Sequence, residues 1–500
     1  MNNLNFLVDV LKESPVFKTL EKNVKPGRTV CASGLSTINK SNIIYALCRL
    51  KGVTAFCLAS DEKEAQTLCN DLSCMGLRAY VYPVRDFNFL DFQSRSHEYE
   101  HARLKVLLKL INHECDVAIA CVDAAAQLTV PRNVLEQSVI EFEEGRELSL
   151  EKATKALTLL GYERFDAVEG SGQFSLRGGI LDFFMPDSDY PVRCEFWGDE
   201  ITDLSYFDIE TQRRFKKADK ITLSPSTEIV IEDRAALADK IEHKAKLLRS
   251  KNSAKAKEKL FSEAELIRSG AMIANADKFI NQIYDKPESL FDYLDRNTLV
   301  FASEFTAIQE RGKSMDFISN ETLMQGFEDG TLCRGFDRFA LTFNECTEFL
   351  QSHGTIVLEN FVHGSMPIKL SEIISFSTKQ LSAWGGSYKQ LKEDVDGLFT
   401  PESKGVIFAG TERAAKNLCD TFNADGINAV YSEGADKISK GELLVMQGAL
   451  SAGFEYPSQK FFAITYSQVS YRPEKSKKKK KKTGQEIYSL SELAPGDYVV

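Results

Sequence analysis

Residues 34–41, with the sequence Gly-Leu-Ser-Thr-Ile-Asn-Lys-Ser, carry the residue types of a phosphate-binding loop. They follow a short apolar run and open a helical pattern, which is where such a loop is expected. In an intact loop a second glycine lets the backbone wrap a phosphate, a lysine reaches its oxygens, and the next hydroxyl holds magnesium. Gly34, Lys40 and Ser41 are present here, but Asn39 replaces the second glycine, and its side chain would crowd a phosphate.

A second group of side chains could recognise a protein. Between residues 168 and 208 polar and apolar residues alternate, which predicts paired strands with a turn or bulge at Gly178–Gly179. Arg177 on one strand, and Arg193 and Trp197 on a later one, fall on the polar faces. Exposed arginine and tryptophan are typical of protein-binding hot spots. On the alternative interpretation the arginines are ordinary solvated residues and Trp197 fills a second core layer.

The amino-acid sequence of these strands resembles that of a known family. GQFSLRGGILDFF (172–184) and PVRCEFWGDEITDLSYFD (191–208) resemble a segment shared by the excision-repair subunit UvrB and the bacterial transcription-repair coupling factors. In that family the segment belongs to a small domain that docks on UvrA, the damage-recognition ATPase. The resemblance implies that Arg177, Arg193 and Trp197 contact UvrA. Cys194 and Trp197 depart from the more usual aliphatic residue and phenylalanine.

Two further features favour the coupling factors over UvrB. UvrB carries a long tyrosine-rich DNA-clamping hairpin after the third strand, and the stretch between Pro83 and Ala102 has no room for one. Residues 448–469 resemble the end of the coupling factors' degenerate third domain, and residues 489–500 resemble the start of their domain that interacts with RNA polymerase. Because the chain ends inside this apolar start of a strand, the sequence suggests a fragment of a longer protein.

The resemblance also bears on ATP hydrolysis. An ATPase with a phosphate-binding loop also needs a strand that ends in Asp-Glu. The aspartate binds magnesium, and the glutamate positions the attacking water. The matching strand here is followed by Ser303 and Glu304, so a hydroxyl stands in place of the magnesium carboxylate. We therefore expect residues Gly34, Asn39, Lys40, Ser41, Ser303 and Glu304 to be a nucleotide site that has lost its function. Weak ATP binding through Lys40 and Ser41 is the alternative.

Composition narrows the class of protein. A chain of 500 residues is too long for one hydrophobic core. Its net charge of −10 argues against a surface that coats nucleic acid throughout. The 11 cysteines lack CxxC spacing, which implies neither disulfides nor a zinc site and predicts no metal. The sequence contains no apolar run long enough to span a membrane and no signal peptide, so we expect a cytoplasmic protein.

The order of strand-like and helix-like segments predicts a multidomain α/β fold. Apolar runs near residues 29–33, 53–60, 78–83 and 116–122 alternate with helical patterns, which is typical of a parallel sheet. The strand-rich module, preceded by a helix predicted to start at Ser149 and to stop at Gly161, then interrupts this first domain. A helical stretch from about Asp233 to Asp295 follows, and a strand at Thr298 resumes the domain. From Phe376 strands alternate with helices again, with strands expected at 405–410, 428–432, 442–447 and 461–466. The predicted parts are 1–126, a UvrB-like α/β domain with a degenerate phosphate loop; 127–214, an inserted UvrA-binding domain; 215–375, the completion of the first domain; 376–472, a smaller vestigial α/β domain; 473–487, a Lys-rich linker; and 488–500, the truncated start of an RNA-polymerase-interacting domain.

Taken together, the residues and the resemblance predict the N-terminal adaptor region of a coupling factor. It would recruit UvrA to RNA polymerase stalled at DNA lesions, and it would need no cofactor and catalyse no reaction itself. The resemblance implies that ATP, magnesium and most DNA contacts belong to motor domains beyond residue 500, which make the parent a double-stranded DNA translocase. A UvrB-type or helicase ATPase and a purely structural spacer are the alternatives.

Overall fold

The computed structural model describes residues 4–85, 97–249, 254–270, 276–361, 366–385 and 387–466. The predicted Lys-rich linker (473–487), the predicted start of a polymerase-interacting domain (488–500) and part of the stretch between Pro83 and Ala102 lie outside these residues. Within them, no helix is both long enough and apolar enough to cross a membrane.

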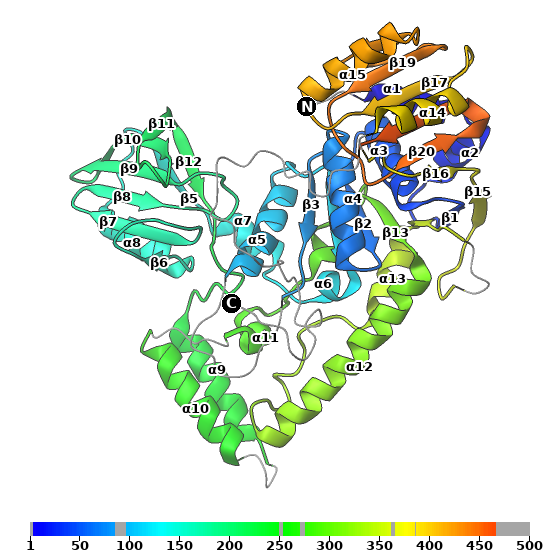
Figure 1. The fold of residues 1–500 in the computed structure, drawn as a ribbon. Coiled ribbons are helices and arrows are strands. Elements are labelled where there is room, and N and C mark those ends of the chain that lie inside the picture. The colour runs from blue at the N-terminus through cyan, green and yellow to red at the C-terminus, as the bar shows by residue number, and fades with distance from the viewer. Residues whose placement is uncertain are drawn as a thin grey trace.

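A seven-stranded parallel sheet forms the centre of the molecule (Figure 1). Its strand order is β15-β1-β14-β13-β2-β4-β3. Strands β1, β2, β4 and β14 are buried along their whole length, and β13 is buried except at Leu299, as in sheets covered by helices on both faces. The strands are β1 (Val30–Ser33), β2 (Ala55–Ala59), β3 (Ala79–Tyr82), β4 (Val117–Cys121), β13 (Leu299–Ser303), β14 (Thr355–Leu358) and β15 (Glu372–Ser375). The predicted parallel α/β class is confirmed.

Strand β13 pairs with β2, with Val300 opposite Phe56, so the chain returns to the first sheet after a long excursion, as the sequence predicts. The helices of this first α/β unit are α1 (Asn5–Lys12), α2 (Pro15–Asn23), α3 (Thr37–Lys51), α4 (Glu62–Cys74), α5 (Glu98–Ile111), α6 (Val122–Ala126), α7 (Arg132–Gln137) and α13 (Phe343–His353). Capping residues mark the N-termini of several of these helices. Ser14 caps α2 ahead of Pro15, and Thr342 with Glu345 forms a capping box on α13.

The inserted strand-rich module is a separate six-stranded sheet with its own core. It stands apart from the central sheet at the left of Figure 1. Helix α8 (Leu150–Leu159), capped by Ser149, packs against one face, close to the predicted helix. A short ladder of β5 (Ile140–Glu143) and β12 (Lys220–Leu223) carries the strand pairing past the predicted boundary at residue 214. The sheet strands are β6 (Glu163–Arg164), β7 (Gln173–Arg177), β8 (Ile180–Phe183), β9 (Val192–Trp197), β10 (Glu200–Phe207) and β11 (Arg214–Lys217).

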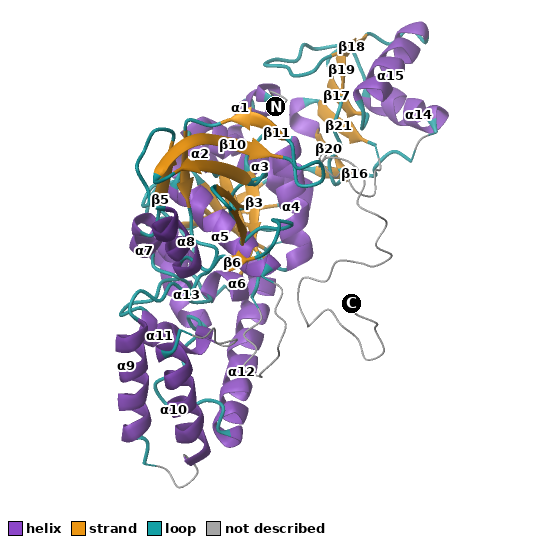
Figure 2. Ribbon diagram, turned by 90° about the vertical axis from the view of Figure 1, so that its left-hand side faces the viewer, coloured by secondary structure: helices purple, strands orange, loops and turns teal. Residues whose placement is uncertain are grey.

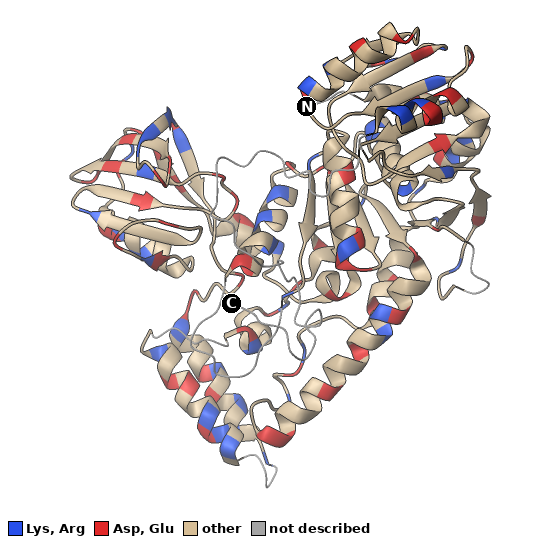
Figure 3. Ribbon diagram, viewed as in Figure 1, with Lys and Arg blue, Asp and Glu red and all other residues tan. Residues whose placement is uncertain are grey.

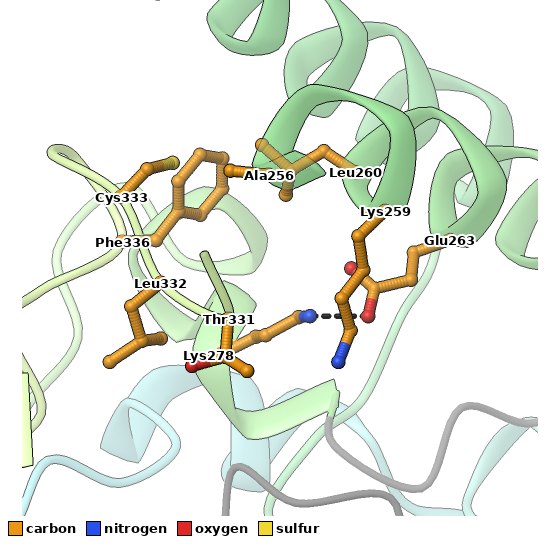
Figure 4. Close-up of a pocket in the computed structure, with 9 residues that line it drawn as sticks. All are labelled: Ala256, Lys259, Leu260, Glu263, Lys278, Thr331, Leu332, Cys333 and Phe336. Atoms are coloured by element: carbon orange, nitrogen blue, oxygen red, sulfur yellow. Dashed lines mark hydrogen bonds and ion pairs between the residues drawn. The ribbon is translucent and has the colours of Figure 1, made fainter. Parts of the chain in front are cut away.

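Helices dominate between the module and β13, as predicted. Helices α9 (Arg234–Leu247) and α10 (Ala254–Arg268) pair, and their apolar faces pack with Phe279 and Phe336. Around this core lie the short elements η2 (Ala276–Phe279), α11 (Ile280–Ile283) and η3 (Leu290–Tyr293). The Lys278 ammonium donates to the Glu263 carboxylate inside it, beneath Leu260 and Phe336 (Figure 4). After β13, the 25-residue helix α12 (Phe305–Asp329) runs back toward α9 and α10.

The second α/β unit holds a six-stranded sheet of order β16-β20-β21-β17-β19-β18. The last four strands are parallel, as the predicted pattern requires, and β20 joins them antiparallel. Its elements are β16 (Lys379–Leu381), α14 (Tyr388–Leu398), β17 (Lys404–Phe408), α15 (Glu412–Ala424), β18 (Ala429–Tyr431), β19 (Glu442–Met446), β20 (Gly453–Tyr456), η4 (Pro457–Gln459) and β21 (Phe461–Thr465).

One of the hydrophobic cores contains residues of both α/β units. Side chains of α1 and α3 pack both against strands of the central sheet and against Val406, Phe408 and Phe461 of the second sheet. All residues of α3 from Ile38 to Cys48 are therefore buried, which explains why this helix has no polar face. Figure 2 shows the second sheet at the upper right, beside α3 and α4.

Candidate functional site

The predicted phosphate loop lies between β1 and α3, but the backbone amides of its first two residues are already used. The Gly34 amide donates to the Asn360 carbonyl at 3.1 Å, and the Leu35 amide donates to the Glu359 carbonyl at 3.1 Å. Gly34 has φ +79°, and a Cβ there would lie 2.2 Å from the Phe376 carbonyl oxygen. Glycine is therefore required by the close approach of the chain that leads into the second α/β unit. These two amides cannot also wrap a phosphate.

Lys40 lies beside Ser303 and Glu304, as the resemblance implies, but it serves as an internal ion-pair partner. Its ammonium donates to Ser303 Oγ at 2.9 Å, to Glu304 Oε1 at 2.5 Å and to Glu64 Oε1 at 3.3 Å. Its side chain is only 2% exposed. Three donors and three acceptors leave the ammonium with no free hydrogen for a nucleotide.

Asn39 and Ser41 are equally enclosed. Ser36 Oγ donates to Asn39 Oδ1 at 2.7 Å, and Asn39 is fully buried. Ser41 Oγ donates to Asp71 Oδ2 at 3.2 Å on α4, and Asp71 also accepts from the amide and hydroxyl of Ser451 in the second α/β unit. Ser41 and Ser303 therefore have different partners. The six residues do not fit a magnesium nucleotide, because the hydroxyls of Ser41 and Ser303 and the carboxylate of Glu304 already have partners within the chain.

The electrostatics of this buried cluster follow from Lys40. Although burial acts to raise the pKa of Glu64, the Lys40 ammonium and hydrogen bonds from Ser303 and Ser60 lower it below its usual value. Glu359, which is fully buried, has the opposite balance: burial and the neighbouring Glu304 raise its pKa to about 7. The cluster thus contains one carboxylate with a lowered pKa, Glu64, and one with a raised pKa, Glu359.

One acidic cluster has the spacing of a metal site. Ligand atoms of Glu62, Cys121 and Asp123 lie within 4.8 Å of one another. The Arg311 guanidinium bonds both carboxylates, donating to Asp123 Oδ1 at 2.9 Å and Oδ2 at 2.7 Å and also to Glu62. Burial raises the pKa of the Cys121 thiol, which disfavours the thiolate a metal needs. Arg311 therefore already supplies the positive charge here.

The polar face of the inserted module is organised around a buried aspartate. Asp182 on β8 is 1% exposed and lies between β7 and β9 in register. The Arg193 guanidinium donates to it twice, from Nε and Nη2, both at 2.8 Å. Arg177 donates to the same carboxylate at 2.9 Å from the other side. One carboxylate thus holds both predicted arginines, although β7 and β9 do not pair with each other.

The two arginines differ in exposure. The Arg177 side chain is 51% exposed, whereas that of Arg193 is 13% exposed. Arg193 also donates to the carbonyl and side-chain oxygens of Gln212 and covers the Phe207 ring at 4.4 Å. The expectation that Arg193 is exposed to solvent is therefore wrong. Most of its hydrogen-bond donors bind groups within the module.

Trp197 occupies the end of β9 next to a tight turn at Gly198, and it is 82% exposed. It shares its face of the strand with Arg193 and Glu195, because alternate residues point the same way. An indole that filled a second core layer would be covered by other side chains. Within the described residues, nothing covers Trp197. The opposite face of β9, including Cys194, packs into the module core.

Sequence reasoning missed the residues that organise this face. Asp182 is the acidic residue inside the apolar strand GGILDFF, and a charged residue there signals a buried partner. The roles of Gln212 and Phe207 depend on how the loop after β10 folds back. No local pattern in the sequence indicates that fold.

Comparisons with known proteins now bear on this geometry. A family model described as the UvrB interaction domain matches residues 140–229, which include the whole sheet. The transcription-repair-coupling factor of Bacillus subtilis (strain 168) is 27% identical over 98% of the chain and 42% of its own length. The chain is homologous to the transcription-repair-coupling factors. Those of Staphylococcus epidermidis (strain RP62A) and Staphylococcus aureus (strain MRSA252) are 26% and 22% identical, over 84% and 99% of the chain.

The predicted resemblance to the coupling factors is thereby confirmed over nearly the whole chain. The chain spans about two fifths of the length of the curated coupling factors that it matches. The match to the UvrB interaction domain begins at β5 and ends after β12. It therefore takes in β12, the partner of β5, which lies beyond the predicted boundary at residue 214.

Proposed function

We propose that this chain is an adaptor in transcription-coupled nucleotide excision repair and that the inserted module binds UvrA. The exposed Trp197, beside arginines held by Asp182 and inside the segment that matches the UvrB interaction domain, is the observation that carries this proposal. A large exposed indole contributes apolar area, and a guanidinium with spare donors binds a partner carboxylate in bidentate geometry. Arg177 has both spare donors and exposure, whereas Arg193 acts mainly by holding the face in shape.

The experiment is a titration of UvrA with the chain, with Trp197→Ala as the informative variant. We expect Trp197→Ala to weaken binding at least about tenfold, which corresponds to about 1.4 kcal/mol, while the fold is unchanged. Phe361→Ala is the matched control, because Phe361 is 72% exposed on the α/β body and lies outside the module. Equal affinity for the parent and Trp197→Ala would refute the assignment of this face.

We further propose that the phosphate-loop region neither binds nor hydrolyses ATP. The enclosed amides of Gly34 and Leu35 and the ion-paired Lys40 support this. Calorimetric titration with Mg·ATP should show no heat of binding, with or without DNA. A saturable signal would favour the alternative of an ATPase that acts on damaged DNA.

In the longer protein we propose that this region delivers UvrA while other parts act on DNA and polymerase. By family resemblance, the segment after residue 488 contacts RNA polymerase, and motor domains that use ATP and magnesium drive double-stranded DNA translocation. A structural spacer would make the same α/β contacts, but it gives no reason for an exposed tryptophan on a charged strand. UvrA binding that Trp197→Ala removes separates the adaptor from the spacer.

A further inference from the structure

Helix α12 is fixed at both ends. At its start, Phe305 and Ile308 enter the core of the α/β body, and a Cβ at Gly312 would lie 2.1 Å from the Phe343 ring. At its end, a Cβ at Gly326 would lie 2.7 Å from Leu332, which lines the small cavity shown in Figure 4. Close packing at both ends holds the helix as a rigid bridge between the α/β body and the α9–α10 pair (Figure 1).

The middle of this bridge exposes large apolar side chains. Phe317, Ile318 and Met324 are 67%, 62% and 60% exposed. A helix that crosses solvent between two anchored ends is expected to be polar on all sides. A cluster of exposed large apolar residues instead marks an interaction surface. Together with Glu321 and Glu328 these three side chains line one shallow hollow along the helix.

The charge of the hollow indicates what it binds. Phe317, Glu321, Met324 and Glu328 recur at spacings of four, three and four residues, so they form one stripe along the helix. Neither Glu321 nor Glu328 has an ion-pair partner among the described residues. From residue 314 to residue 330 the sequence contains four acidic residues and no lysine or arginine, and Figure 3 shows red without blue along this part of α12.

We propose that the middle of α12, from Phe317 to Glu328, is a docking site for an amphipathic helix of a partner protein whose apolar face is bordered by lysine or arginine. Apolar side chains of that helix would cover Phe317, Ile318 and Met324, and its cations would meet Glu321 and Glu328. Alternating apolar and charged contacts of this kind are how paired helices choose partners. The site lies outside the module proposed to bind UvrA, so the two proposals stand or fall separately.

The test uses the whole chain and a labelled helical peptide of about three heptads, with leucine at the apolar positions and lysine beside them. A second peptide carries glutamate in place of each lysine. Fluorescence anisotropy should show binding of the lysine peptide and at least tenfold weaker binding of the glutamate peptide. Phe317→Ser with Met324→Ser should weaken binding of the lysine peptide at least tenfold. Glu321→Lys with Glu328→Lys should reverse the preference between the peptides.

The matched control is Glu393→Lys with Asp396→Lys, which makes the same charge change on α14 in the second α/β unit. It should leave both affinities unchanged within twofold. Circular dichroism should show every variant folded, because the altered side chains are exposed. The proposal is overturned if the control weakens binding as much as the α12 variants do, or if the Phe317→Ser, Met324→Ser variant binds like the parent. Sedimentation equilibrium that shows a dimer lost in that variant would also overturn it, because the occupant would be a second copy of the chain.

Discussion

At the scale of single residues, Arg193 shows how a residue predicted to bind a partner can have a structural role. Its guanidinium binds Asp182 in bidentate geometry, bonds Gln212 and covers Phe207, so most of its donors are used within the module. Arg177 donates to the same carboxylate from β7, on the other side of β8, and about half of its side chain faces solvent. Asp182 therefore fixes the positions of both arginines. Trp197 needs no such support, because its place follows from the strand alone.

We predict that Arg193→Ala destabilises the chain. Removing Arg193 leaves the buried Asp182 with Arg177 as its remaining cation, so the free energy of unfolding should fall by about 1–3 kcal/mol. Arg177→Ala should cost about 1 kcal/mol or less, because Arg193 still satisfies the carboxylate. Equilibrium denaturation in urea measures both changes. Equal small effects would mean that Asp182 does not depend on Arg193.

A pH dependence follows from Glu359. Its pKa in the folded chain is raised to about 7 from 4.5, so the folded state holds this proton more tightly than the unfolded state. Its contribution to stability is complete below about pH 4.5 and is lost as the pH rises through about 7. Glu359→Gln removes this titration. Across that pH range, the free energy of unfolding of the variant should rise relative to that of the parent by on the order of 1 kcal/mol. A difference that stays flat with pH, measured by urea denaturation, would contradict the assignment.

At the scale of elements, the sequence predicts those with strong periodicity. The apolar runs of β1, β2, β3 and β4, the helix α8 after Ser149 and the strands of the second α/β unit lie where their patterns place them. Helix α12 was not predicted, because its exposed middle gives it little amphipathic signal. The contacts of α3 with the second sheet were also not predictable, since they join residues more than 400 positions apart, such as Asn42 and Tyr456. Periodicity reports which face is buried, but it does not report what covers that face.

The contact between α4 and the second α/β unit carries a prediction of its own. Asp71 accepts hydrogen bonds from the amide and hydroxyl of Ser451, and burial raises its pKa to about 6. Asp71→Ala leaves these donors without their acceptor, so the free energy of unfolding should fall by about 1–3 kcal/mol. Hydrogen exchange of the Ser451 amide should become faster. Asn70→Ala, at an exposed position of the same helix, should change neither quantity.

At the scale of the whole molecule, the chain separates support from recognition. Two α/β units with a shared core form a body in which side chains of the chain itself fill the predicted nucleotide site. The module that matches the UvrB interaction domain has its own core and stands away from that body. On the proposal that this site binds no nucleotide, the body serves as a scaffold. A recognition surface on a separate module remains accessible to a partner as large as UvrA.

The central claim is that this module binds UvrA through the face that holds Trp197 and Arg177. The most direct test is the affinity of purified UvrA for the chain and for the double variant Arg177→Ala, Trp197→Ala, measured by isothermal titration calorimetry. We expect the parent to bind and the double variant to lose at least about a hundredfold in affinity, while its free energy of unfolding changes by about 1 kcal/mol or less. Absence of UvrA binding by the parent, or an unchanged affinity of the folded double variant, would contradict the account.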